Sequence, residues 1–166
     1  MKHLKKILAV ALVCVMALTV LTGCGKSVQD YTNEINGKLG ANSGIAADQG
    51  CSDSAKKLID GVKKIGIPEV IKIANDPSQG QAIADKIMKD AGLSTETSRF
   101  SLSASGYGQK VMIGMDGKVD QSGDASTFFA DQLKKNNATE GNMKVTKYGI
   151  ATYSIMGIDI VVMVAQ

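Results

Sequence analysis

The chain has no tryptophan, and its 166 residues include only one histidine and one arginine. The histidine, His3, lies near the N-terminus, so residues 24–166 contain no imidazole. This excludes from residues 24–166 the Ser-His-Asp and Cys-His nucleophile systems and zinc sites that rely on imidazole. Arg99 is the only guanidinium, and nucleic-acid binding is expected to need a clustered Lys/Arg face. We therefore expect no nucleic-acid partner.

The N-terminal segment has a basic start, an uncharged apolar run and a short close that ends in cysteine. The apolar run, Ile7 to Val20, is shorter than the about 20 residues that a membrane span needs, and it is typical of a cleaved signal. The close, Leu21-Thr22-Gly23-Cys24, resembles a lipobox, where bacterial lipoprotein precursors are lipidated on cysteine and cut just before it. The resemblance implies cleavage between Gly23 and Cys24, and a diacylglyceryl group on Cys24 joined by an N-acyl chain such as palmitate. The alternative is an N-terminal anchor helix that stays attached.

Removal of residues 1–23 changes what the composition implies. Three lysines in this segment account for the formal net charge of +3, so the mature chain is neutral. Cys14 leaves with the signal and Cys24 is acylated, which leaves Cys51 alone and permits no intramolecular disulfide. We interpret Cys51 as a neutral thiol near a domain edge, with intermolecular pairing as the alternative.

These features divide the chain into three parts. We expect a signal peptide over residues 1–23, a lipidated N-terminus and tether over 24–50, and a single domain over 51–166. The tether would lift the domain off the lipid surface. Apolar spacing within it predicts a short helix from about Ser27 to Lys38, so partial packing is left open. The expected location is extracytoplasmic, with the lipid anchor in the cell membrane or the outer membrane.

Apolar residues at helical spacing, with capping residues at the ends, predict three helices in the domain. The expected helices run from residue 52 to 66 with Asp53 or Ser54 as cap, from the capping box of Ser78 and Gln81 to Gly92, and from Asp124 to Lys135. Gly66 should end the first of them, and Pro68 should open a further short turn.

The second half of the chain also contains segments with strand patterns. The expected strands cover residues 99–104, 111–113, 144–155 and 158–165. In the first strand, Phe100, Leu102 and Ala104 are predicted to face inward. Both faces of the last strand are apolar, so it should be central in a sheet that is covered on both sides. The pattern predicts an α+β fold, a three-layer α/β/α sandwich with a mainly antiparallel sheet.

Two motifs resemble reactive sites, and each has a plainer interpretation. The stretch from Ser54 to Lys57 matches the S-x-x-K of penicillin-recognising serine enzymes, but no Lys-Thr-Gly follows, and a helix cap beside solvated lysines explains it. Asp116, Asp120 and Asp124 could supply oxygen ligands to calcium. Their spacing does not match an EF-hand, and turn and cap roles account for them. We therefore predict no catalytic residue, no metal and no cofactor.

A longer stretch resembles the opening of bacterial CAP (SCP-like, pathogenesis-related) domains. It comprises Ile65-Gly66-Ile67-Pro68-Glu69-Val70, then Asn75-Asp76-Pro77 and an alanine-rich helix. The strand around residues 106–113 then matches the position of the family's G-E-N strand, and the final hairpin resembles its C-terminal half. The likeness covers about residues 54–166 and implies a CAP-like sandwich whose cleft binds an apolar or peptide ligand.

The chain departs from this family at the cleft itself. CAP domains commonly carry two histidines and two glutamates there, sometimes with a divalent metal, whereas this chain has Gln109 at the G-E-N glutamate and no histidine nearby. The resemblance thus implies a cleft with Tyr107, Gln109 and Tyr148 but without the polar tetrad.

We expect a non-catalytic, lipid-anchored binding or interaction domain. The alternative is an envelope assembly or inhibitor-type lipoprotein of unrelated fold, whose partner is a protein. A hydrolase that uses a Ser/Lys pair or carboxylates is a third hypothesis, which requires such groups within hydrogen-bond reach of one another in a cleft.

Overall fold

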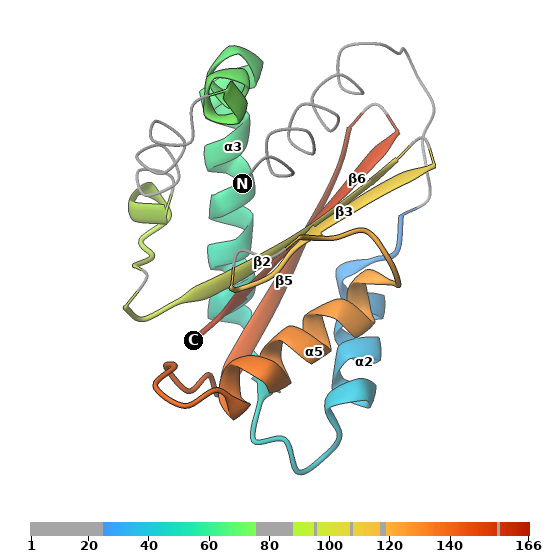
Figure 1. Ribbon diagram of the computed structural model, residues 1–166, viewed down its shortest axis with the longest axis vertical. Coiled ribbons are helices and arrows are strands. Elements are labelled where there is room, and N and C mark those ends of the chain that lie inside the picture. Colours follow the sequence, from blue (N-terminus) through green and yellow to red (C-terminus); the bar gives the residue numbers. More distant parts are fainter. Residues whose placement is uncertain (1–24, 76–87, 95, 107, 117–118, 156) are drawn as a thin grey trace.

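A computed structural model describes residues 25–75, 88–94, 96–106, 108–116, 119–155 and 157–166 (Figure 1). The helices are α2 (Val28–Leu39), α3 (Gln49–Asn75) and α5 (Ala125–Ala138). The strands are β1 (Ala46–Ala47), β2 (Arg99–Gly106), β3 (Gln109–Ile113), β4 (Val119–Asp120), β5 (Lys147–Ile155) and β6 (Ile158–Ala165). The predicted capping box of Ser78 and Gln81 lies outside the described residues.

The strands form one sheet in the order β1-β5-β6-β2-β3-β4. The short β1 pairs with β5 in parallel, and the other neighbouring pairs are antiparallel. Strand β6 lies between β5 and β2, so the central position that its two apolar faces predicted is confirmed. The predicted hairpin of the last two strands is also confirmed. Helices with a mixed sheet give the expected α+β class.

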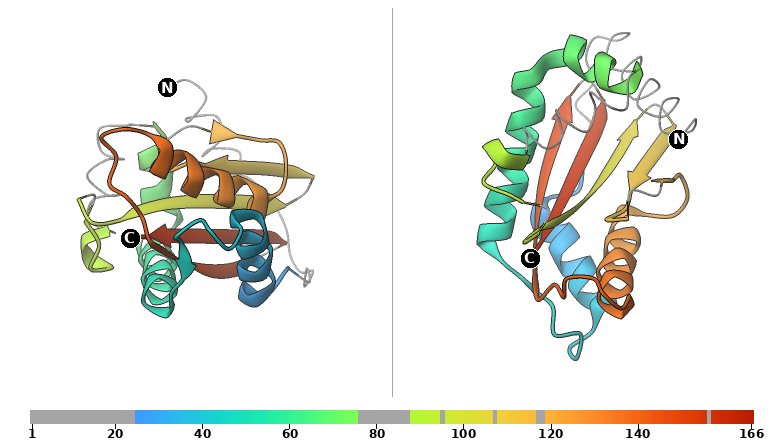
Figure 2. Two further views of the ribbon diagram at one scale, coloured as in Figure 1. Left: turned by 90° about the horizontal axis from the view of Figure 1, so that it is seen from below. Right: turned by 60° about the vertical axis from the view of Figure 1, so that its left-hand side comes forward.

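The two faces of the sheet pack against different helices (Figure 2). On β5, Tyr148 and Ile150 pack with the buried residues of α2 and α5. Ala151 and Tyr153 alternate with them and pack with Ala55 and other residues of α3. Each face therefore has its own apolar cluster, and β6 contributes side chains to both.

The face of β2 that is buried is not the one we predicted. Ser101 and Ser103 are buried at 0% and 3% exposure, whereas Phe100 is 37% exposed and Leu102 is only partly buried. The register places Ser101 beside Met163 of β6, on the face that α2 and α5 cover. The alternation of β2 was correct, but its apolar residues lie on the opposite face, which α3 covers mainly over β5 and β6.

Helix α3 begins earlier and runs further than the sequence predicted. It starts at Gln49, and the Asp48 carboxylate accepts a hydrogen bond from the Cys51 backbone at 2.9 Å, so neither Asp53 nor Ser54 is the cap. The helix continues through Gly66 and Pro68, which we expected to interrupt it. Figure 2 shows that the C-terminal part of α3 bends away from the rest, as a proline inside a helix causes.

Helix α2 is packed into the domain. Ser27 is its N-cap and forms a capping box with Asp30, while Ile35 and Leu39 are buried against α5 and the sheet. Of the expected tether, only Gly25 and Lys26 stand between Cys24 and this cap. Two extended residues span about 7 Å, so the domain begins almost directly after Cys24.

Helix α5 begins where the sequence predicted. The Asp124 carboxylate accepts from the Thr127 backbone at 3.0 Å and caps the helix. Phe129 and Leu133 are completely buried against α2 and the sheet.

Candidate functional site: a pocket at the start of α2

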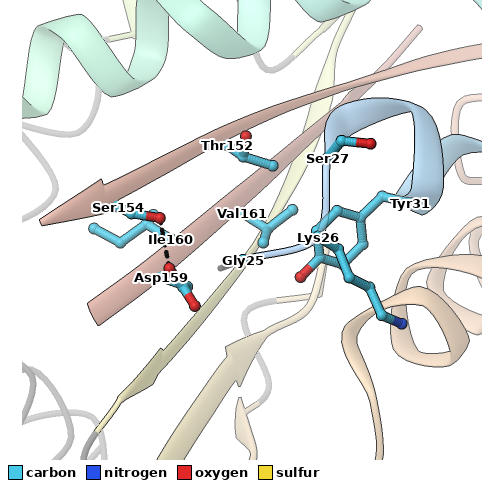
Figure 3. A pocket seen from close by; sticks show the side chains of 9 residues that line it. All are labelled: Gly25, Lys26, Ser27, Tyr31, Thr152, Ser154, Asp159, Ile160 and Val161. Atoms are coloured by element: carbon cyan, nitrogen blue, oxygen red, sulfur yellow. Dashed lines mark hydrogen bonds between the residues drawn. The ribbon is translucent and has the colours of Figure 1, made fainter. Parts of the chain in front are cut away.

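A pocket of about 300 Å³ lies between the start of α2 and the β5–β6 hairpin (Figure 3). Two distant parts of the sequence form its walls. The lining residues are Gly25, Lys26, Ser27 and Tyr31 from the start of α2, and Thr152, Ser154, Asp159, Ile160 and Val161 from the hairpin. The turn between β5 and β6 brings Ser154 and Asp159 into register opposite each other. The capping box of α2 fixes the direction in which the chain enters the helix, and this places Gly25 at the wall.

Asp159 is the carboxylate of this pocket. The Ser154 hydroxyl donates a hydrogen bond of 2.5 Å to one of its oxygens. Gly25 packs tightly beside it, because a Cβ at that glycine would lie 3.2 Å from the same oxygen. In the described part of the chain, no lysine or arginine forms an ion pair with Asp159.

Lys26 belongs to a network that ties α2 to α5. Its ammonium group donates to both oxygens of Glu34, at 2.7 and 2.8 Å, and Glu34 accepts a third hydrogen bond of 2.6 Å from the Ser126 hydroxyl. These hydrogen bonds lower the pKa of Glu34, with the one from Lys26 contributing most, and the bond to Glu34 raises the pKa of Lys26. Lys26 thus lines the pocket with its stem, while its ammonium points away from Asp159 (Figure 3).

The pKa of the Tyr31 hydroxyl depends on burial and on the charged groups near the pocket. Burial is the main cause that raises the pKa of its hydroxyl. The positive charge of Lys26 opposes this rise, and the negative charges of Asp159, Glu34 and Asp124 add to it. Three carboxylates and one ammonium group therefore act on the Tyr31 hydroxyl.

Of the cleft residues that the CAP resemblance implied, Tyr148 lies in the core and not among the residues that line this pocket. Tyr148 is completely buried, and its hydroxyl donates to the Asn36 side chain at 2.8 Å and to the Thr32 carbonyl at 3.2 Å. Burial raises the pKa of Tyr148 to about 12. The backbone of Gln109 pairs with Gly106 in the β2–β3 hairpin. Tyr107 lies outside the described residues, and so do the cleavage residue Gly23 and the lipidation residue Cys24.

The carboxylates considered for calcium have separate partners. Asp116 forms an ion pair of 2.9 Å with Lys135, Asp120 accepts from Ser122, and Asp124 caps α5. In the ranges that the structure describes, no group of three His, Cys, Asp or Glu side chains could hold a metal ion.

Ser54 and Ser126 are poorly placed for nucleophilic chemistry. Ser54, the serine of the S-x-x-K stretch, lies inside α3, and Lys56, which precedes the motif's Lys57, pairs with Asp53 at 3.5 Å. Ser126 has a carboxylate partner in Glu34, but it is completely buried and a substrate could not reach it. The Ser126–Glu34 hydrogen bond instead links α5 to α2.

Cys51 is also a core residue. It is completely buried and unpaired, and burial raises the pKa of its thiol to about 11, so the thiol is neutral as expected. Cys51 does not lie at a domain edge, because its side chain is completely buried. Its Sγ lies 3.8 Å from the side-chain oxygen of Gln166.

No pattern in the sequence predicted that residues 25–31 and 152–161 would form one pocket. Residues 25–31 resembled a tether, and the β5–β6 hairpin resembled an ordinary strand turn. A single unmatched acidic residue, Asp159, between the apolar Ile158 and Ile160 was the one feature that could have marked the site.

No family model, curated protein or solved structure matches this chain. None of the helices in the described ranges is long and apolar enough to cross a membrane. The proposals below therefore depend on the residues themselves.

Proposed function

We propose that the chain is the precursor of a lipid-anchored extracytoplasmic protein whose α+β domain is a non-catalytic binding domain. The observation that carries the anchor is the stretch Leu21-Thr22-Gly23-Cys24 after a basic start and a short apolar run. Cleavage before Cys24 and acylation of its thiol attach the mature chain to the membrane. A second acyl chain makes this attachment stable, because one chain alone binds a bilayer only marginally.

The short distance between Cys24 and α2 supports a binding role close to the membrane. Gly25, the next residue in the sequence, already lines the pocket with Asp159. A lipid on Cys24 would thus hold the mouth of this pocket within about 10 Å of the bilayer surface, at about 3.5 Å for each extended residue. The polar lining suits a small polar molecule or a lipid head group.

The proposal also covers the layer architecture of the domain. We propose that α2 and α5, the sheet, and α3 form the three layers of an α/β/α sandwich, which the two separate apolar clusters support. The resemblance to CAP domains remains a prediction from the short motifs around Pro68 and Gly106. An experimental structure that includes residues 76–87 would test it.

Fatty-acid labelling of the protein in a bacterial host tests the anchor. The wild-type chain should take up labelled palmitate and lose residues 1–23. Cys24→Ala should leave the precursor uncleaved and unlabelled, whereas the matched control Cys51→Ala, which removes a buried thiol, should be processed and labelled like wild type. Processing of Cys24→Ala at the same place would refute the proposal.

A further inference from the structure

We infer that the pocket at the start of α2 binds a small organic cation through its ammonium group, with the Asp159 carboxylate as counter-ion. The inference rests on the proposed function, since it names the ligand class of that binding domain. The ammonium group belongs either to an amine-bearing lipid head group or to a free amine, and the experiment below separates these sources.

Asp159 has carboxylate lone pairs that are free to accept hydrogen bonds from a ligand. Ser154 occupies one carboxylate oxygen, and Asp159 has no cationic partner within the described ranges. Its side chain is only partly exposed and lies in the pocket lining (Figure 3). A carboxylate in a partly desolvated position attracts an ammonium partner more strongly than one in bulk water does, because the Coulomb attraction of opposite charges grows as the effective dielectric constant falls.

The charged side chains around the pocket also favour a cationic ligand. Glu34 and Asp124 add to the negative field that Asp159 exerts on Tyr31. The nearby Lys26 is engaged by Glu34, and Figure 3 shows its ammonium directed away from Asp159. Asp159 is therefore the charged group of the lining that is left to attract a ligand, and it attracts a cation.

The remaining wall of the pocket matches an amine on a short carbon chain. The hydroxyls of Thr152 and Tyr31 are acceptors for the other N–H groups of an ammonium ion. Val161 offers an apolar contact to the carbon chain. A divalent metal ion is a poorer fit, since calcium takes six to eight oxygen ligands and Asp159 is the only carboxylate in the lining. The volume of about 300 Å³ limits the ligand to a small molecule or head group.

The test is an NMR titration of the purified full chain in detergent micelles, with ethanolamine as the probe and its neutral amide, N-acetylethanolamine, as the matched ligand. We expect saturable shifts at Tyr31 and Asp159 with ethanolamine and none with the amide. Asp159→Asn should weaken ethanolamine binding about tenfold or more, as loss of a hydrogen bond to a charged group does. Asp159→Glu should retain binding, and Asp53→Asn, which neutralises an exposed carboxylate on α3, should bind like wild type.

A second arm identifies the source of the ammonium group. The full chain is placed in bicelles of phosphatidylglycerol, with or without phosphatidylethanolamine. Shifts at Tyr31 and Asp159 that appear only with phosphatidylethanolamine support the lipid head group. Shifts with free ethanolamine but not with phosphatidylethanolamine support the free amine.

The inference is overturned if ethanolamine and phosphatidylethanolamine both leave these signals unchanged, or if N-acetylethanolamine produces equal shifts. The comparison of the two ligands on wild type remains decisive if Asp159→Asn does not fold. Failure of the anchor proposal has a different signature, because palmitate labelling at Cys24 is measured separately and the ethanolamine titration does not require it.

Discussion

Gly149 of β5 lies where α3 passes over the sheet, and its replacement by alanine should destabilise the fold severely. A Cβ at this position would lie 1.9 Å from the Ser52 nitrogen and 2.3 Å from the Cys51 carbonyl carbon. Both are backbone atoms of α3, so no side-chain rotation can relieve the clash. The helix must move away from the strand, by about 1 Å or more before ordinary contact distances are restored.

The size of the effect can be worked from the contacts at this crossing. Overpacking of a core costs about 1 to 3 kcal/mol, and a clash between backbones belongs at the upper end. The movement would also stretch the hydrogen bond from the Ile150 backbone to the Ser52 hydroxyl, now 3.2 Å, which contributes about 1 kcal/mol. We expect Gly149→Ala to lower the free energy of unfolding by about 3 to 4 kcal/mol.

Urea denaturation followed by far-ultraviolet circular dichroism measures this change, since the chain has no tryptophan for fluorescence. With a urea dependence of about 2 kcal/mol per molar, the midpoint should fall by about 1.5 M or more. Gly37→Ala in α2 is the matched control. A Cβ there meets nothing within 4 Å, and alanine should stabilise the helix by about 0.5 to 1 kcal/mol. A Gly149→Ala protein within 1 kcal/mol of wild type would refute the close packing of α3 on β5.

Three further predictions concern single groups. The Ser101 hydroxyl is buried without a hydrogen-bond partner among the described residues, so Ser101→Ala should leave stability unchanged or raise it by about 1 kcal/mol in the same denaturation assay; a loss of more than 1 kcal/mol would mean that the hydroxyl is bonded. Ser27→Ala removes the N-cap of α2 and should cost about 1 kcal/mol, and an unchanged midpoint would contradict the capping box. Stability should fall as the pH rises from about 9 to 12, because burial raises the pKa of Cys51 to about 11 and that of Tyr148 to about 12. The unfolded chain loses these protons at the lower, ordinary pKa values, so this contribution is complete below pH 9 and is lost as the folded groups ionise. Urea midpoints measured across this range should decline less for Tyr148→Phe than for wild type, and equal declines would contradict the assignment.

The sequence predicted best those features that depend on neighbouring residues. Asp124 was recognisable as a cap because the side chain that accepts the hydrogen bond lies three positions from its donor. The central place of β6 followed from its own pattern, since a strand that is apolar on both faces needs cover on both.

The errors have a common physical origin in contacts between distant segments. Alternation in β2 defined its two faces, but only the packing of other elements against β2, α5 among them, decided that the face with Ser101 and Ser103 was buried. The start of α3 was missed because Asp48 caps it from a polar stretch that carries few apolar residues. The pocket joins residue 25 to residue 159, and no local pattern could have predicted that meeting.

Mass spectrometry of the mature protein from its native membrane tests the central claim most directly. The account predicts an N-terminal peptide that begins at Cys24, carries a diacylglyceryl group with or without an N-acyl chain, and continues into Gly25 and Lys26. An N-terminus at Met1, or an unmodified Cys24 thiol in the mature protein, would contradict it.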